Sequence, residues 1–237
     1  MKLIGLALGI LLVLLAALEV VATRAARGDS ASPPMRFDRV VRDDFFEGLR
    51  GNAARLDNAM KRCEEELAKD PRHAQALVWH GSGLTFRAGQ AARRGDLAAA
   101  GELIEQGRKE MNDAVAIAPG DTVVLLLRGV TLSRASAGVG DRDLRVALLR
   151  TAVGDYETTL GIQKEIFAQL SVHARGELLG ALAESWQRLG DDAKSRAYLT
   201  RIVAEVPFSP YAETAEKWLT RKPAAGEGLT CLGCHGD

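Results

Sequence analysis

The sequence predicts an all-α protein built from paired helices. Between residues 45 and 219, apolar residues recur at steps of three or four, which is the spacing of one face of an α-helix. Runs rich in β-branched or aromatic residues are few, and only 5% of all residues are aromatic, so strands are not expected. Proline and glycine recur at matching places, which indicates an internal repeat.

The first segment, residues 1–22, is apolar and long enough to cross a bilayer. Only Lys2 and Glu19 interrupt it, and about 20 apolar residues span the hydrocarbon core. A cleaved signal peptide has a shorter core of about 7–15 residues, although Val20–Ala22 could serve as a cleavage site. We therefore expect one transmembrane anchor, with a cleaved signal peptide as the alternative.

Residues 23–36 are expected to form a linker, because they combine glycine, serine and the pair Pro33–Pro34. Helical periodicity follows. Its first stripe predicts a single helix that ends before Pro71, since proline disfavours helix in the residue before it. The stripe consists of Phe45, Leu49, Ala53, Leu56, Met60, Cys63 and Leu67. Packing is the expected role of Cys63.

Two copies of a repeat come next, about 48 residues apart. Pro71 precedes Gly81 by the spacing at which Pro119 precedes Gly129, and leucines flank both glycines at matching positions. At these positions the block resembles the tetratricopeptide (TPR) repeat, a helix–turn–helix unit of about 34 residues. The extra length divides equally between two helices, so the resemblance implies elongated hairpins. His80 and Arg128 stand where the repeat usually has leucine.

Turn residues then divide the region into hairpins. The expected elements are a first hairpin that turns at Arg94–Asp96 and ends before Pro119, a second with helices over 121–137 and 142–170, a third of standard length that turns at Gly190–Asp192, and a last helix over 211–219. The prediction is a TPR-like α-solenoid of about three hairpins over residues 37–220, the first two elongated, with flanking helices. An irregular helical bundle is the alternative.

The tail, residues 221–237, carries the chemistry. It begins as a flexible linker and then reads Cys231-Leu232-Gly233-Cys234-His235. This C-x-x-C-H motif is typical of covalent c-type haem attachment. Cys231 and Cys234 would each form a thioether with a haem vinyl group, and His235 would be the proximal ligand of the haem iron. We expect one covalent haem c.

Three other interpretations of the motif stay open. It could be a chance arrangement of residues. A thioredoxin-type dithiol would open a helix after a strand, and no strand pattern precedes this motif. A zinc site would need a fourth ligand from elsewhere in the chain.

Few residues follow the motif, so a sixth iron ligand is expected from upstream, from a partner protein or from a second copy. The upstream candidates are Met35, Met60, Met111, His73 and His173. Met60 and Met111 also fit a helical core. An iron without a sixth ligand would be open to small gases or peroxide.

Charge and composition narrow the class of function. The formal net charge is zero, which argues against a nucleic-acid partner. No cluster in the repeat region looks catalytic, so we expect an electron carrier or scaffold rather than an enzyme. TPR arrays bind protein segments, and the resemblance therefore implies a protein partner, with a membrane redox complex as the first expectation.

Location follows from the two termini together. Covalent haem is normally attached after export, so the body is expected to face the periplasm from a single-pass inner-membrane anchor, or to be exported if the signal is cleaved. Two alternatives remain: a cofactor-free assembly scaffold in the cell envelope, and a haem-based sensor with an open iron site.

Overall fold

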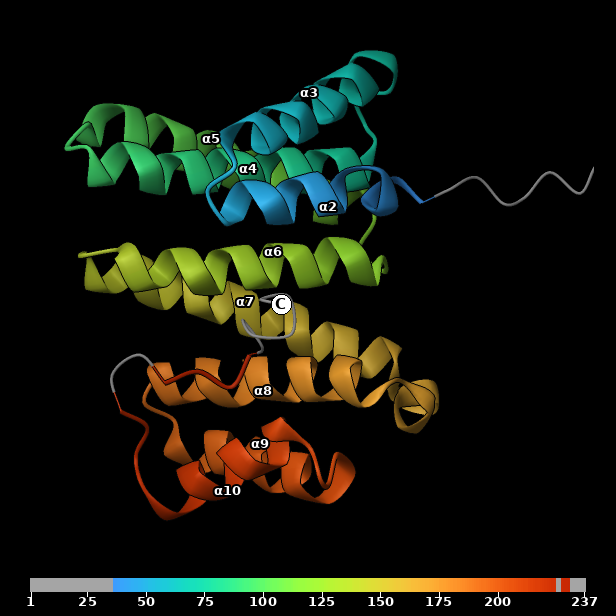
Figure 1. The fold of residues 1–237 in the computed structure, drawn as a ribbon, viewed down its shortest axis with the longest axis vertical. Helices are drawn as coiled ribbons and strands as arrows, with labels where there is room; N and C mark the ends of the chain where they lie inside the picture. The colour runs from blue at the N-terminus through green and yellow to red at the C-terminus, as the bar shows by residue number, and fades with distance from the viewer. Residues whose placement is uncertain (1–35, 225–226, 231–237) are drawn as a thin grey trace, which may run out of the picture. The chain divides into compact units, whose positions relative to one another are not determined.

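The computed structural model describes residues 36–224 and 227–230, and its regular structure is entirely helical there (Figure 1). The helices are α2 (Phe37–Leu49), α3 (Ala53–Lys69), α4 (Ala74–Arg93), α5 (Leu97–Ile117), α6 (Thr122–Ala135), α7 (Arg142–Ile162), α8 (Val172–Arg188), α9 (Asp192–Glu205) and α10 (Pro210–Thr220), with short 3₁₀ helices η1 (Ser136–Gly138) and η2 (Lys164–Gln169). The all-α prediction is confirmed for this part of the chain.

The membrane anchor expected over residues 1–22 lies outside the described residues, as does nearly all of the linker over 23–36. Within the described ranges, no helix is both long enough and apolar enough to cross a membrane.

Successive helices pack as hairpins, α4 on α5, α6 on α7 and α8 on α9 (Figure 1). The turns predicted at Gly95 and Gly190 are confirmed, and both glycines have positive φ, at 85° and 80°. Asp96 and Asp191 then cap α5 and α9 by accepting a backbone N–H, which satisfies a helix-end donor. Glycine followed by aspartate is therefore the local cause of these reversals.

The hairpins differ in length. The helices α4 and α5 have 20 and 21 residues, whereas α8 and α9 have 17 and 14, so the elongated first hairpin is confirmed. In the second hairpin α7 has 21 residues but α6 has 14. The helix expected to reach residue 170 ends at Ile162, and 3₁₀ helix η2 follows it.

The single helix expected across residues 45–67 is wrong. The chain breaks into α2 and α3 at Gly51, whose φ is 110°, and Asn52 caps α3 by accepting from the Arg55 N–H. Phe45 of α2 and Leu56 and Met60 of α3 lie in the same core, whereas Leu49 and Ala53, the stripe residues beside the break, are exposed. The periodicity of apolar residues in the sequence does not by itself reveal such a break between two helices.

Cys63 is fully buried in this core, and burial raises the pKa of its thiol. The expected packing role is therefore confirmed, and the thiol is protected from reaction because the thiolate is the reactive form.

The repeated glycines permit close approach within hairpins. A Cβ on Gly81 of α4 would lie 2.6 Å from the carbonyl oxygen of Gly107 on α5. A Cβ on Gly129 of α6 would lie 2.7 Å from the ring of Tyr156 on α7. Both glycines face the second helix of their own hairpin. The repeated glycines therefore mark places where the two helices of a hairpin are in contact.

Gly129→Ala is expected to lower the free energy of unfolding by about 1–3 kcal/mol, because the added methyl overpacks against the buried Tyr156 ring. Gly154→Ala on α7 is the matched control, since no atom lies within 4 Å of its Cβ position. There the higher helix propensity of alanine should stabilise by about 0.5–1 kcal/mol. Denaturant unfolding of both variants, followed by circular dichroism, checks this; equal effects would contradict it.

Candidate functional site

The predicted haem-binding residues Cys231, Cys234 and His235 lie outside the described residues. The structure does describe Glu227–Thr230, the segment that leads directly into the motif. This segment crosses α8 (Figure 1).

Leu229 docks on α8. Its side chain is 4% exposed, and its backbone N–H donates to Oε2 of Glu184 at 3.2 Å. A Cβ on Gly180 would lie 3.0 Å from the carbonyl oxygen of Leu229 and 3.3 Å from its Cβ. Glycine at position 180 therefore leaves the space that the tail backbone occupies, and burial of the leucine side chain stabilises that contact.

Arg221 and Glu227 close the tail upstream of this contact. The guanidinium donates through Nη1 and Nη2 to the two carboxylate oxygens at 2.8 and 2.6 Å, and the Ala224 N–H donates to the same carboxylate at 2.9 Å. A bidentate fork fixes direction as well as distance. It turns the chain that leaves α10 back towards α8.

Glu227 gives a prediction about pH. The Arg221 fork, assisted by the Ala224 N–H, lowers the pKa of the Glu227 carboxyl to about 2. A lowered pKa contributes stability above the ordinary carboxyl value, and that contribution is lost as the pH falls from about 4.5 towards 2. We expect a carboxyl-carbon NMR titration of Glu227 with a midpoint near 2. In Arg221→Gln the midpoint should return to the usual glutamate range; an unchanged midpoint would contradict this account.

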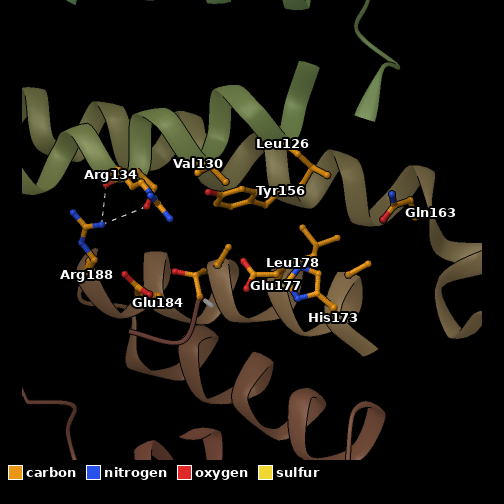
Figure 2. Close-up of a pocket in the computed structure, with 14 residues that line it drawn as sticks. Leu126, Val130, Arg134, Tyr156, Gln163, His173, Glu177, Leu178, Glu184 and Arg188 are labelled. Atoms are coloured by element: carbon orange, nitrogen blue, oxygen red, sulfur yellow. Dashed lines mark hydrogen bonds between the residues drawn. The ribbon is translucent and has the colours of Figure 1, made fainter. Parts of the chain in front are cut away.

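Beside the docked leucine lies a groove between α6, α7 and α8, with a cavity of about 200 Å³. Figure 2 shows α6 on one side, α8 on the other, and Tyr156 of α7 between them. Its walls are formed by Leu126, Val130, Ser133, Arg134, Tyr156, Gln163, His173, Ala174, Glu177, Leu178, Ala181, Glu184, Arg188 and Thr230. Thr230, the residue before Cys231 in the sequence, is one of these lining residues.

Arg188 closes one end of the groove by bridging α8 to α6 (Figure 2). Its Nη1 donates to the Ser133 carbonyl at 2.9 Å, and its Nη2 donates to Oγ of Ser136 at 2.5 Å. Burial lowers the pKa of the Arg188 guanidinium. These bonds hold α6 and α8 at a fixed separation, so the groove is part of the fold.

The other end of the groove carries a chain of three polar side chains. The Tyr211 hydroxyl donates to Oε1 of Glu177 at 2.8 Å and lies 2.9 Å from Nδ1 of His173. The imidazole of His173 is exposed at the groove wall and oriented by this chain.

Of the other candidate sixth ligands, Met35 lies outside the described residues. Met60, Met111 and His73 have structural roles. Met60 and Met111 are 1% and 0% exposed in the core. His73 caps α4 by accepting from the Ala76 N–H at 3.1 Å. No group of three or more His, Cys, Asp or Glu residues forms a metal site among the described residues.

Sequence reasoning missed the docking contacts. The sequence predicts a flexible linker at the start of the tail, whereas the described residues Glu227–Thr230 lie against α8. Leu229, Gly180 and Glu184 were not singled out. The available indication was an isolated leucine two residues before the motif, in an otherwise small and polar tail.

No family model, curated protein or solved structure matches the chain.

Proposed function

We propose that the protein is a membrane-anchored, extracytoplasmic TPR-like scaffold that binds a protein partner and carries one covalent haem c for electron transfer. The observation that carries the proposal is the motif Cys231-Leu232-Gly233-Cys234-His235. The apolar segment over residues 1–22 supports export, and export supports haem attachment.

The donor set suits this group. Each thioether forms by addition of a cysteine S–H across a vinyl double bond: the S–C bond forms, the hydrogen goes to the other vinyl carbon, and nothing leaves. Cys231 and Cys234 supply the two thiols, and His235 supplies the proximal imidazole. When bound, the haem supplies one-electron chemistry at its iron.

The thioredoxin-type alternative is less well supported. That motif follows a strand, and no strand occurs among the described residues, including Glu227–Thr230 ahead of the motif. The free thiol of Cys63 is buried in the core, so it is not a resolving partner for the tail cysteines.

The groove beside Thr230 is too small to enclose a haem. Its cavity of about 200 Å³ is smaller than the roughly 300–1,000 Å³ of sites that enclose a small molecule. The half-buried Leu126 and Val130 give it an apolar wall on α6. Residues of this chain would therefore cover one side of a haem held at its mouth, and a partner protein would cover the rest.

The helical hairpins support the proposal of a scaffold function. Stacked hairpins that each contact their neighbours are the construction of solenoid proteins, whose extended surfaces bind protein segments. The hairpins α4/α5 and α6/α7, with glycines that repeat about 48 residues apart, support an elongated TPR-like repeat. A membrane redox complex is the partner class that would use both the anchor and the haem.

A pyridine haemochrome spectrum tests the proposal. Full-length protein made together with cytochrome c maturation machinery should show the α-band of a haem c that survives denaturation and acid–acetone extraction. Absence of that band would overturn the electron-transfer function and leave the cofactor-free scaffold. Fractionation of the same cells should recover the protein with the inner membrane.

A further inference from the structure

The described residues 227–230 of the tail lie on a small recognition surface of α8. Leu229 buries its side chain there, and its backbone N–H donates to Oε2 of Glu184 at 3.2 Å. A Cβ on Gly180 would lie 3.0 Å from the carbonyl oxygen of Leu229, so the bare glycine lets the tail backbone approach the helix. We call the surface formed by Gly180 and Glu184 the α8 seat.

The α8 seat recognises features that any extended protein segment offers. Glu184 accepts a backbone N–H, Gly180 makes room for a backbone carbonyl, and an apolar side chain is buried between them and the groove. In peptide recognition, main-chain hydrogen bonds contribute affinity and the burial of particular side chains gives specificity. The seat therefore suits an extended segment that carries a leucine-sized side chain, whichever chain supplies it.

Few contacts hold the tail on the seat. The Leu229 N–H bond, at 3.2 Å, is longer than the roughly 2.9–3.0 Å of a typical N–H···O bond. Upstream, the side chains of the Arg221–Glu227 ion pair are 48% and 35% exposed, and exposed ion pairs contribute little to stability. The docking rests mainly on one buried leucine side chain, so a competing segment with more contacts would displace it.

The groove next to the seat offers such additional contacts. Of the described tail residues, Thr230 lines this groove. The half-buried side chains of Leu126 and Val130 lie across it on α6 (Figure 2), and Arg188 holds α6 and α8 together at one end. A longer segment that starts at the α8 seat would bury these two side chains as well.

We propose that the α8 seat and the adjoining groove bind an extended segment of a protein partner, and that residues 227–230 compete with this segment as an autoinhibitory contact. A tethered segment meets its site at a high effective concentration. The apparent affinity for the partner then falls with the fraction of seats that the tail leaves accessible. This inference rests on the scaffold role in the proposed function and is independent of the haem.

The test is the binding of a fluorescent peptide with the sequence of residues 221–230 to full-length protein, measured by fluorescence anisotropy. In Leu229→Asp the tail should leave the seat, because a carboxylate is costly to bury. This protein should bind the peptide about tenfold more tightly than the wild-type protein, or tighter still, because the tethered competitor is gone. The same peptide carrying Leu229→Asp should bind neither protein.

A second substitution locates the binding site. Gly180→Leu, added to the Leu229→Asp protein, should abolish peptide binding, because the new side chain fills the place of the peptide backbone. Gly154→Leu on α7 is the matched control, since no atom lies within 4 Å of its Cβ position, and it should leave binding unchanged. Far-UV circular dichroism should show the same helix content in all these proteins.

A milder release of the tail gives an independent readout. Arg221→Gln removes the ion pair with Glu227 but keeps the leucine. Its affinity for the peptide should lie between those of the wild-type and Leu229→Asp proteins. A peptide carrying Leu229→Met should keep its affinity for the Leu229→Asp protein, whereas a peptide carrying Leu229→Gly should lose it, since the side chain supplies most of the contact.

The outcomes separate this inference from the proposed function. A Leu229→Asp protein that binds the peptide no better than the wild-type protein would overturn the inference and leave haem attachment standing. A wild-type dimer that becomes monomeric in Leu229→Asp, measured by light scattering, would assign the docked tail to a second copy and would also overturn it. Absence of the haem α-band would instead overturn the electron-transfer function and leave the peptide result standing.

Discussion

Replacing Cys231 and Cys234 together by serine should abolish covalent haem attachment. The serine hydroxyl does not form the thioether that the thiol forms with a vinyl group, and the remaining His235 would supply only one coordinate bond. Denaturing gels stained for haem should lose the band completely, and intact mass should fall by one haem. Helix content should stay unchanged, because the fold contacts described for the tail end at Leu229 and Thr230.

Cys63→Ala is the matched control for that experiment. Cys63 is fully buried, and burial raises the pKa of its thiol, so its removal should leave haem content at the wild-type level. Single Cys231→Ser or Cys234→Ser proteins should retain one thioether and show a shifted haemochrome band. A double serine protein that still holds haem after denaturation would contradict the assignment.

Local turn chemistry made much of the fold predictable. Gly95 and Gly190 adopt the positive φ that glycine accommodates, and the aspartates after them cap the next helices. The spacing of apolar residues predicts one helix through Gly51, but Leu49 and Ala53 in that stripe are exposed, and Asn52 caps a second helix. The periodicity of apolar residues indicates which face of a helix is buried, whereas capping residues indicate where a helix begins or ends.

The candidate site was predictable only in its chemistry. The spacing of the C-x-x-C-H motif is enough to identify the two thiols and the imidazole as candidate haem-binding groups. The contact of Leu229 with Gly180 and Glu184 joins residues about 45 apart in sequence, and no local pattern records such a pairing. The same holds for the chain from His173 through Tyr211 to Glu177.

His80 and Arg128, which stand at matching positions about 48 residues apart in the sequence, each pair with a carboxylate on the second helix of their own hairpin. His80 contacts Glu110, and Arg128 contacts Asp155. The same kind of polar bridge therefore joins the two helices in both hairpins.

Arg128→Met should be among the most destabilising single changes in the repeat body. Arg128 donates through Nε and Nη2 to the Asp155 carboxylate at 2.8 and 2.6 Å, and its Nη1 donates to Asn112 at 2.9 Å. The Asp155 side chain is 3% exposed. Removing one partner of a buried ion pair leaves an uncompensated charge and costs about 3–5 kcal/mol. Denaturant unfolding of the full-length chain, followed by circular dichroism, measures this loss.

The double variant Arg128→Met/Asp155→Leu separates the lost pair from lost packing. Replacing both charges by apolar groups is often neutral or stabilising, so the double variant should be more stable than Arg128→Met alone. Loss of stability equal to the sum of the two single changes would contradict this account.

The pH dependence of Arg128→Met follows from the same burial. In the wild-type protein, burial raises the pKa of the Asp155 carboxyl while Arg128 acts in the opposite direction. Without the guanidinium the pKa of this carboxyl in the folded state rises further above its unfolded value. A raised carboxyl pKa lowers stability as the pH rises through that window. The destabilisation of Arg128→Met should therefore be largest at neutral pH and shrink in acid, where a protonated Asp155 is less costly to bury; a destabilisation that grows in acid would contradict the assignment.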